Sequence, residues 1–164
     1  MPITKFQVEV FKLLRKNRNP DSYVAGGTAI HRLDDSLRYS HDIDLFHETD
    51  LAVVNSFNAD KKSIFDAKLN LTIHILQPSF IRAKVSNGMD EVELDWVRDT
   101  AFRFFPVIED PLLGYRLHDV DLVVNKVLAL GNRSEVRDVI DVVEANREIL
   151  ALEVACSRHL SVER

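Results

Sequence analysis

Residues 24–46 read Val24-Ala-Gly-Gly-Thr-Ala-Ile-His-Arg-Leu-Asp-Asp-Ser-Leu-Arg-Tyr-Ser-His-Asp-Ile-Asp-Leu-Phe46, and this stretch decides the fold that we expect. A short apolar strand over 23–25 runs into Gly26 and Gly27, and a helix is predicted over 28–33. Glycine lets a backbone approach a ligand closely, and the first free N–H groups of a helix attract anions. Together with the hydroxyl of Thr28, the two glycines therefore indicate a bend suited to a phosphate.

Two aspartates follow the bend, on a strand predicted over 42–46. Alternate residues of a strand share a face, so Asp42 and Asp44 point the same way while Ile43 and Leu45 face the core. Adjacent carboxylates repel each other unless a cation lies between them, and Mg²⁺ takes one or two carboxylates plus substrate phosphates. Taken alone, the pair is more often the acidic solvent face of a half-buried strand. Only in combination with the glycine bend does it favour a metal site.

The rest of the chain predicts two further helices in its first third, then strands and finally helices. Capped by Thr4, an amphipathic helix begins the chain, and another helix covers 51–57. Further strands are predicted over 69–76, 80–85, 91–97 and 102–107, followed by helices that begin near 119, 136 and 149. Strands followed by helices indicate an α+β fold with a small helical appendage. We place the core in residues 1–110 and the appendage, packed on it, in 111–164.

The glycine bend, the spacer and the Asp-apolar-Asp-apolar strand together resemble the nucleotidyltransferase superfamily. The fuller strings Ala25-Gly-Gly-Thr-Ala29 and Arg38-Tyr-Ser-His-Asp-Ile-Asp-Leu-Phe46 look like the AbiEii/AbiGii-type toxins of bacterial abortive-infection and toxin–antitoxin systems. The resemblance implies a polymerase β-like core, in which a mixed sheet is flanked by helices.

The resembled family also uses a third carboxylate on a later strand, and residues 91–97 offer one. The alternation of Glu91-Val-Glu-Leu-Asp-Trp-Val97 places its three acids on one face and its apolar residues on the other. Asp95, flanked by Leu94 and Trp96, is our choice, and Glu93 has the same flanking pattern. Without the expectation set by Asp42 and Asp44, this strand too would be assigned an acidic solvent face.

What the resemblance implies chemically is a Mg²⁺ (or Mn²⁺) site formed by Asp42, Asp44 and Asp95. Two such ions would bind the triphosphate of an incoming NTP and activate an attacking hydroxyl. Asp95 could also accept the proton of that hydroxyl. Phosphoryl transfer depends mostly on positioning and charge neutralisation, so few other groups are required.

Several polar side chains are candidates for binding the nucleotide beside the glycine bend. Lys126, in an otherwise apolar helix, is either a flanking lysine whose stem covers apolar surface or a ligand of the triphosphate. By resemblance, Arg38 and Ser40 could contact the β- and γ-phosphates. Arg133 and Asp141, spaced with Arg137 at helical intervals, are expected to form ordinary surface ion pairs.

Composition excludes several classes of protein. The chain has 164 residues, a net charge of −5, 46% hydrophobic residues and the single cysteine Cys156. No apolar run approaches the roughly 20 residues of a membrane span, and no secretory signal is visible, so we expect a cytoplasmic protein without a membrane partner. The negative charge argues against a wide grip on nucleic acid. Neither a Walker A motif nor a Gly-x-Gly-x-x-Gly fingerprint is present, which disfavours P-loop and Rossmann enzymes.

The resemblance implies a nucleotidyltransferase that moves a nucleoside monophosphate from an NTP to a hydroxyl. By resemblance, the acceptor is the end of an RNA such as tRNA, a protein or a small molecule. The protein could also be the toxin of a toxin–antitoxin pair, with an antitoxin as partner. Two alternatives stay open: a non-catalytic relative that binds a nucleotide for regulation or assembly, and a metal-dependent phosphohydrolase.

Overall fold

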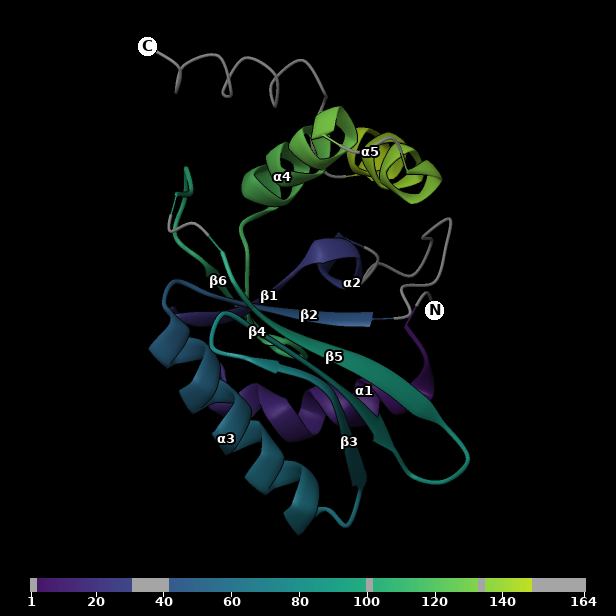
Figure 1. Ribbon diagram of the computed structural model, residues 1–164. Coiled ribbons are helices and arrows are strands. Elements are labelled where there is room, and N and C mark those ends of the chain that lie inside the picture. Colours follow the sequence, from purple (N-terminus) through teal and green to yellow (C-terminus); the bar gives the residue numbers. More distant parts are fainter. Residues whose placement is uncertain (1–2, 31–41, 100–101, 133–134, 149–164) are drawn as a thin grey trace.

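A computed structural model describes residues 3–30, 42–99, 102–132 and 135–148. In these ranges seven strands form one sheet in the order β3-β4-β5-β2-β1-β7-β6 (Figure 1). The strands are β1 Ser22–Ala25, β2 Asp42–His47, β3 Asn70–Gln77, β4 Phe80–Ser86, β5 Glu91–Arg98, β6 Ile108–Asp110 and β7 Gly114–Arg116. The pairs β2–β5 and β1–β7 are parallel and the other pairs antiparallel, so the expected mixed sheet is confirmed.

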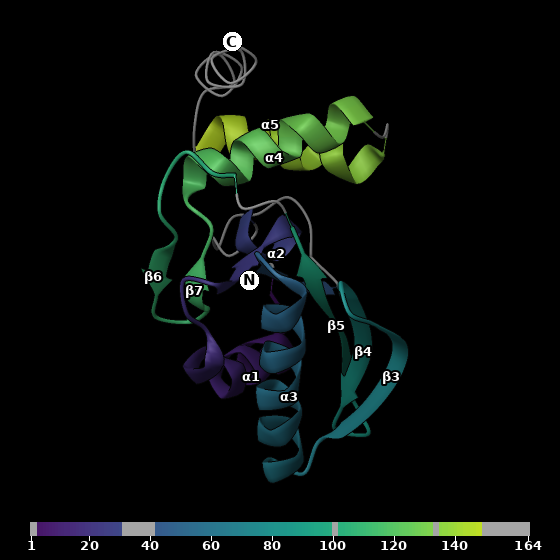
Figure 2. The same cartoon turned by 60° about the vertical axis from the view of Figure 1, so that its left-hand side comes forward.

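Helices cover both faces of this sheet, which confirms the α+β class. They are α1 Lys5–Leu14, α2 Gly26–Ile30, α3 Asp50–Asp66, α4 Asp119–Asn132 and α5 Val136–Glu148, with a short 3₁₀ turn at Arg15–Asn17. Helices α1 and α3 lie on one side, and α2, α4 and α5 lie on the other (Figures 1 and 2). The helix predicted from residue 149 onward falls outside the described residues. None of the described helices combines the length and the apolar character that a membrane crossing requires.

Side-chain caps set the starts of the two long helices beneath the sheet. Thr4 and Gln7 form a capping box at α1, in which each side chain bonds the backbone N–H of the other residue. Thr49 caps α3 by accepting from the N–H of Ala52. Helix α3 extends well beyond the predicted 51–57. The prediction ended too early because two of the residues that α3 buries after Phe57 are polar, and they interrupt the apolar period.

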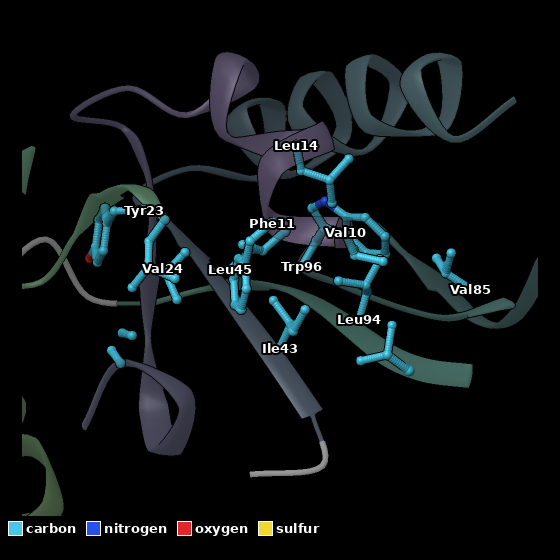
Figure 3. Close-up of a cluster of buried hydrophobic side chains, with 14 of the residues drawn as sticks. Val10, Phe11, Leu14, Tyr23, Val24, Ile43, Leu45, Val85, Leu94 and Trp96 are labelled. Atoms are coloured by element: carbon cyan, nitrogen blue, oxygen red, sulfur yellow. The ribbon is translucent and has the colours of Figure 1, made fainter. Parts of the chain in front are cut away.

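The main core lies between the sheet and the helices α1 and α3 (Figure 3). Ile43 and Leu45 of β2 are buried there, as are Leu94 and Trp96 of β5, so the expected alternation of both strands is confirmed. The Trp96 ring packs edge-to-face on Phe57 of α3, with ring centroids 5.1 Å apart. Because these apolar side chains face α1 and α3, the acidic side chains of the same strands face the opposite layer.

A buried polar cluster lies beneath the sheet, around Asp60 of α3. The carboxylate of Asp60 accepts a hydrogen bond from the Arg18 guanidinium at 2.6 Å, from Asn17 at 2.8 Å and from the Trp96 indole at 2.8 Å. Arg18 and Asp60 are both buried, so their charges depend on each other rather than on water. The cluster fastens α3 to the turn before β1.

His47, at the end of β2, is buried beside this cluster and predicts a pH dependence of stability. Its Nδ1–H donates to the Val97 carbonyl at 3.3 Å, so Nε2, 3.0 Å from the Ser22 hydroxyl, accepts from that group. Burial, with a smaller contribution from the nearby Arg18 charge, lowers the pKa of His47 to about 4. Between about pH 6.5, the pKa of histidine in the unfolded chain, and about pH 4, His47 is protonated in the unfolded chain but stays neutral in the folded one.

We therefore expect His47 to contribute stability at neutral pH that is lost as the pH falls from about 6.5 to about 4, by about 3 kcal/mol in total. Urea unfolding of the wild type and of His47→Gln between pH 7 and pH 4 isolates this contribution, because carboxylates that titrate in the same range are common to both proteins. The wild type should show the steeper loss. Equal slopes would contradict the assignment.

The segment predicted as a strand over 102–107 is not one. The N–H groups of Phe104 and Phe105 donate to the buried carboxylate of Asp121 at 2.7 and 3.1 Å, so this backbone bonds α4 instead of a neighbouring strand. The sheet gains two unpredicted short strands, β6 and β7. Since β7 pairs with β1, the sheet continues to Arg116, and α4 and α5 follow it.

Candidate active site

Five carboxylates lie on one face of the two central strands, and four of them stand opposite one another across the β2–β5 pair. In the parallel pair β2–β5, Asp42 is opposite Glu93 and Asp44 is opposite Asp95. Paired strands lie about 4.7–4.9 Å apart, and residues directly opposite point to the same face. The fold therefore brings Asp42 and Asp44 beside both candidates for the third acid. Asp95 adjoins Asp44, and Glu93 adjoins Asp42.

The glycine bend lies directly against Asp44. Gly26 follows β1 with a positive φ of 67°, and a Cβ built on it would lie 2.0 Å from Asp44 Oδ2. Only glycine permits both this backbone conformation and this close approach. Gly27 is buried behind it, and the hydroxyl of the buried Thr28 donates to the backbone carbonyl of Asp42. Thr28 thus fastens α2 to the start of β2.

Gly26→Ala is expected to lower the free energy of unfolding by about 1–2 kcal/mol and to displace the Asp44 carboxylate. The added methyl group would occupy the position of Oδ2, in a backbone conformation that side chains avoid. Gly131→Ala is a matched control, since among the described residues no atom outside its own stretch of α4 lies within 4 Å of its Cβ position, and alanine there should be neutral or stabilising. Urea unfolding of both variants checks this, and equal stabilities would contradict it.

A cavity of about 220 Å³ joins Asp44 and Gly26 to helix α4. Its remaining lining residues are Ala25, Phe46, Leu122, Asn125, Lys126 and Ala129. The β2 wall of the cavity therefore carries the carboxylate of Asp44, and the α4 wall carries Lys126. A phosphate could lie between them if a cation joined it to the carboxylate. The sequence did not indicate Phe46 or Asn125, because neither residue belongs to a charged or glycine-rich pattern.

Lys126 borders this cavity but is also paired with two carboxylates of α5. Its Nζ lies 2.7 Å from Asp141 Oδ2 and 3.5 Å from Asp138 Oδ1. Asp138 and Asp141 are fully buried, so the expectation of a surface ion pair at Asp141 is wrong. The lysine charge lets α5 pack its acidic face on α4, while Val139 and Val143 are exposed. Arg133 and the side chain of Arg137 lie outside the described residues.

The carboxylate of Asp95 is held by an arginine that sequence reasoning missed. Arg82 of β4 lies opposite Asp95, and its Nε and Nη2 donate to the two carboxylate oxygens at 2.8 and 2.6 Å. Glu93 contacts the same Nε at 3.1 Å. The hydrogen bonds with Asp95 raise the pKa of Arg82, so its charge is permanent. The only signal in the sequence was an Arg at a polar position of a predicted strand.

The residues present fit a divalent cation at Asp42 and Asp44. These two carboxylates share a face and supply the hard oxygen ligands that Mg²⁺ takes together with phosphates. Among residues 3–30, 42–99, 102–132 and 135–148, no three Asp, Glu, His or Cys side chains form a group able to hold a metal ion. Asp95 is next to the pair but is neutralised by Arg82. Arg38 and Ser40, predicted to bind phosphates, lie outside those ranges.

Comparison with known proteins finds solved structures that share the fold of this chain. Neither a protein-family model nor a curated protein matches the chain. Among the solved structures that do match are two crystal structures from Helicobacter pylori: one described as a "putative nucleotidyltransferase", with a TM-score of 0.60 and 18% identity, and that of JHP933, with 0.58 and 19%. The chain shares their fold. Each match covers 86% of this chain, and 67% and 65% of the two structures, so the chain spans about two thirds of their length.

Proposed function

We propose that this chain is a Mg²⁺-dependent nucleotidyltransferase, which transfers a nucleoside monophosphate from an NTP to a hydroxyl. The observation that carries the proposal is the register of β2 and β5, which places Asp42, Asp44 and Asp95 on one face of the sheet, with Asp44 against the Gly26 bend. The shared fold with a structure described as a "putative nucleotidyltransferase" supports it. Phosphoryl transfer needs mainly position and charge neutralisation, which such a face can provide.

In this proposal the cavity between β2 and α4 receives the triphosphate. Gly26 of the bend lines one side of this cavity, and Lys126 lines the other. Gly27 and Thr28, which follow Gly26 in α2, are buried. The lysine ammonium has three donors, so it can hold Asp141 and donate to a phosphate oxygen at the same time. The assignment of Arg38 and Ser40 to the phosphates rests on the sequence resemblance.

The acceptor hydroxyl would approach from the β5 side. Its oxygen forms a bond to the α-phosphorus, the bond from the α-phosphorus to the bridging oxygen breaks, and pyrophosphate leaves. Asp42, Asp44 and Asp95 would hold the cation, and Asp95 would also accept the hydroxyl proton. Bound Mg²⁺ supplies charge neutralisation and lowers the pKa of the attacking hydroxyl. Glu93 is the alternative third acid, because it adjoins Asp42 in the same register.

Incubation with each α-labelled NTP, Mg²⁺ and total cellular RNA or lysate tests this function. Label attached to an acceptor, with no attachment from γ-labelled NTP, is the expected result. Label released as nucleoside monophosphate or as phosphate without an acceptor would instead show a phosphohydrolase. Nucleotide binding without any turnover would favour the non-catalytic relative. The nature of the labelled acceptor decides between RNA, a protein and a small molecule.

A toxin role is a separate proposal, supported by the resemblance of residues 25–46 to the AbiEii/AbiGii-type toxins. If it holds, induced expression of the wild type should arrest bacterial growth, and the Asp44→Asn variant should not. Growth arrest by both proteins, or by neither, would contradict a toxin that acts through nucleotide transfer. A partner antitoxin would then be sought only after arrest by the wild type alone.

A further inference from the structure

Arg82 occupies the place next to Asp95 where a cation would be expected. Without a cation, the carboxylates of Asp44 and Asp95 on adjacent strands would repel each other. The planar guanidinium instead bonds both oxygens of Asp95, in the geometry that makes Arg–carboxylate pairs strong. Asp95 is 7% exposed at its side chain, and Arg82 is 36% exposed, so the pair lies at the edge of the site.

The arginine fork and a divalent cation make competing demands on Asp95. A cation bound to Asp42, Asp44 and Asp95 would stand close to the positive guanidinium, and like charges at such separations repel. A carboxylate that already holds an arginine also shares less of its negative charge with a metal. Two states of Asp95 follow, one held by Arg82 and one available to the ion.

We propose that Arg82 is a positioning residue that holds Asp95 in the cation-free protein and competes with the divalent cation for its carboxylate. This inference rests on the proposed function, since it takes Asp95 as the third metal-site carboxylate. Asp42 and Asp44 receive the ion first, and the ion then draws Asp95 from Arg82. The third carboxylate joins the site only when the cation is bound, and until then Arg82 balances its charge.

Titration with Mn²⁺, followed by electron paramagnetic resonance of the free ion, tests the competition without any need for turnover. Arg82→Gln should bind Mn²⁺ about 5–150-fold more tightly than the wild type, the usual range of coupling between two ligands of one protein. Lys84→Gln is the matched control. Lys84 lies two residues along the same strand, points to the same face and pairs with Glu91 at 2.9 Å. Its loss removes the same charge without freeing Asp95.

A double-mutant comparison separates competition from a general electrostatic effect. In an Asp95→Asn background, Arg82→Gln should leave the Mn²⁺ affinity unchanged, because the shared carboxylate is gone. Arg82→Lys, which keeps the charge but loses the fork, should fall between the wild type and Arg82→Gln. Equal affinities in the wild type and Arg82→Gln, or equal gains in Arg82→Gln and Lys84→Gln, would overturn the proposal.

Stability gives a second readout and separates this inference from the proposed function. Without metal, Arg82→Gln should unfold at lower urea than the wild type, since Asp95 loses its partner, and saturating Mn²⁺ should narrow the difference. If Arg82→Gln binds Mn²⁺ no more tightly than the wild type, and the wild type transfers labelled nucleotide, the competition is refuted and the proposed function is not. If Arg82→Gln binds Mn²⁺ more tightly than the wild type, but the wild type transfers no nucleotide, the proposed function is refuted and the competition is not.

Discussion

Asp44→Asn is expected to lower nucleotide transfer by at least about 10²–10³-fold while leaving the fold intact. The amide keeps the size of the carboxylate, so it still fits against Gly26, but it loses the charge that holds a cation beside the triphosphate. The free energy of unfolding should stay equal or rise, because repulsion with Asp42 and Asp95 falls. Label transfer from α-labelled NTP measures the activity, and urea unfolding measures the stability.

Asp90→Asn provides the control for that variant. Asp90 is exposed in the turn between β4 and β5, away from the cavity, and its substitution removes the same charge. It should transfer nucleotide at the wild-type rate. A stable Asp44→Asn protein with wild-type transfer would contradict the assignment of this carboxylate.

Asp60→Asn is expected to lower the free energy of unfolding by about 3–5 kcal/mol. The substitution leaves the Arg18 guanidinium buried without its counter-charge, and Arg18 Nε, also buried, already has no hydrogen-bond partner in the part of the chain that the structure describes. Asn17 and the Trp96 indole also donate to this carboxylate, so one change weakens four hydrogen bonds that join α3 to the turn before β1 and to β5.

Urea unfolding checks this loss, with Asp66→Asn as the control on the same helix. Asp66 is exposed at the end of α3, so its substitution should change stability by no more than about 0.5 kcal/mol. Similar stabilities of the two variants would show that the buried pair is not what fastens α3. Transfer activity of the Asp60→Asn protein should fall only as far as the protein unfolds.

The parts of the fold that the sequence could predict are those with a local signature. Ile43 and Leu45 alternate with Asp42 and Asp44, which fixed both the strand and the face of the two acids. The same alternation around Asp95 predicted β5. The sequence also predicted that the bend needs glycine for a close approach, and the positive φ of Gly26 and its contact with a side chain agree with that. It did not predict that this side chain is Asp44.

What could not be predicted depends on contacts between residues far apart in the chain. The fork between Arg82 and Asp95 follows from the pairing of β4 with β5, which no local pattern specifies. Asp138 and Asp141 look like surface charges on a helix, but both are buried, and Lys126 of α4 pairs with them. Strands β6 and β7 have three residues each, too few to show a period.

Crystals grown with Mn²⁺ and a non-hydrolysable NTP would test the central claim most directly, through anomalous diffraction at the manganese edge. We predict a manganese peak bonded to carboxylate oxygens of Asp42 and Asp44 and to phosphate oxygens, with the triphosphate between Gly26 and Lys126. Asp95 should then face the ion rather than Arg82. A nucleotide bound elsewhere, or bound in this cavity with no manganese at the two aspartates, would contradict the account.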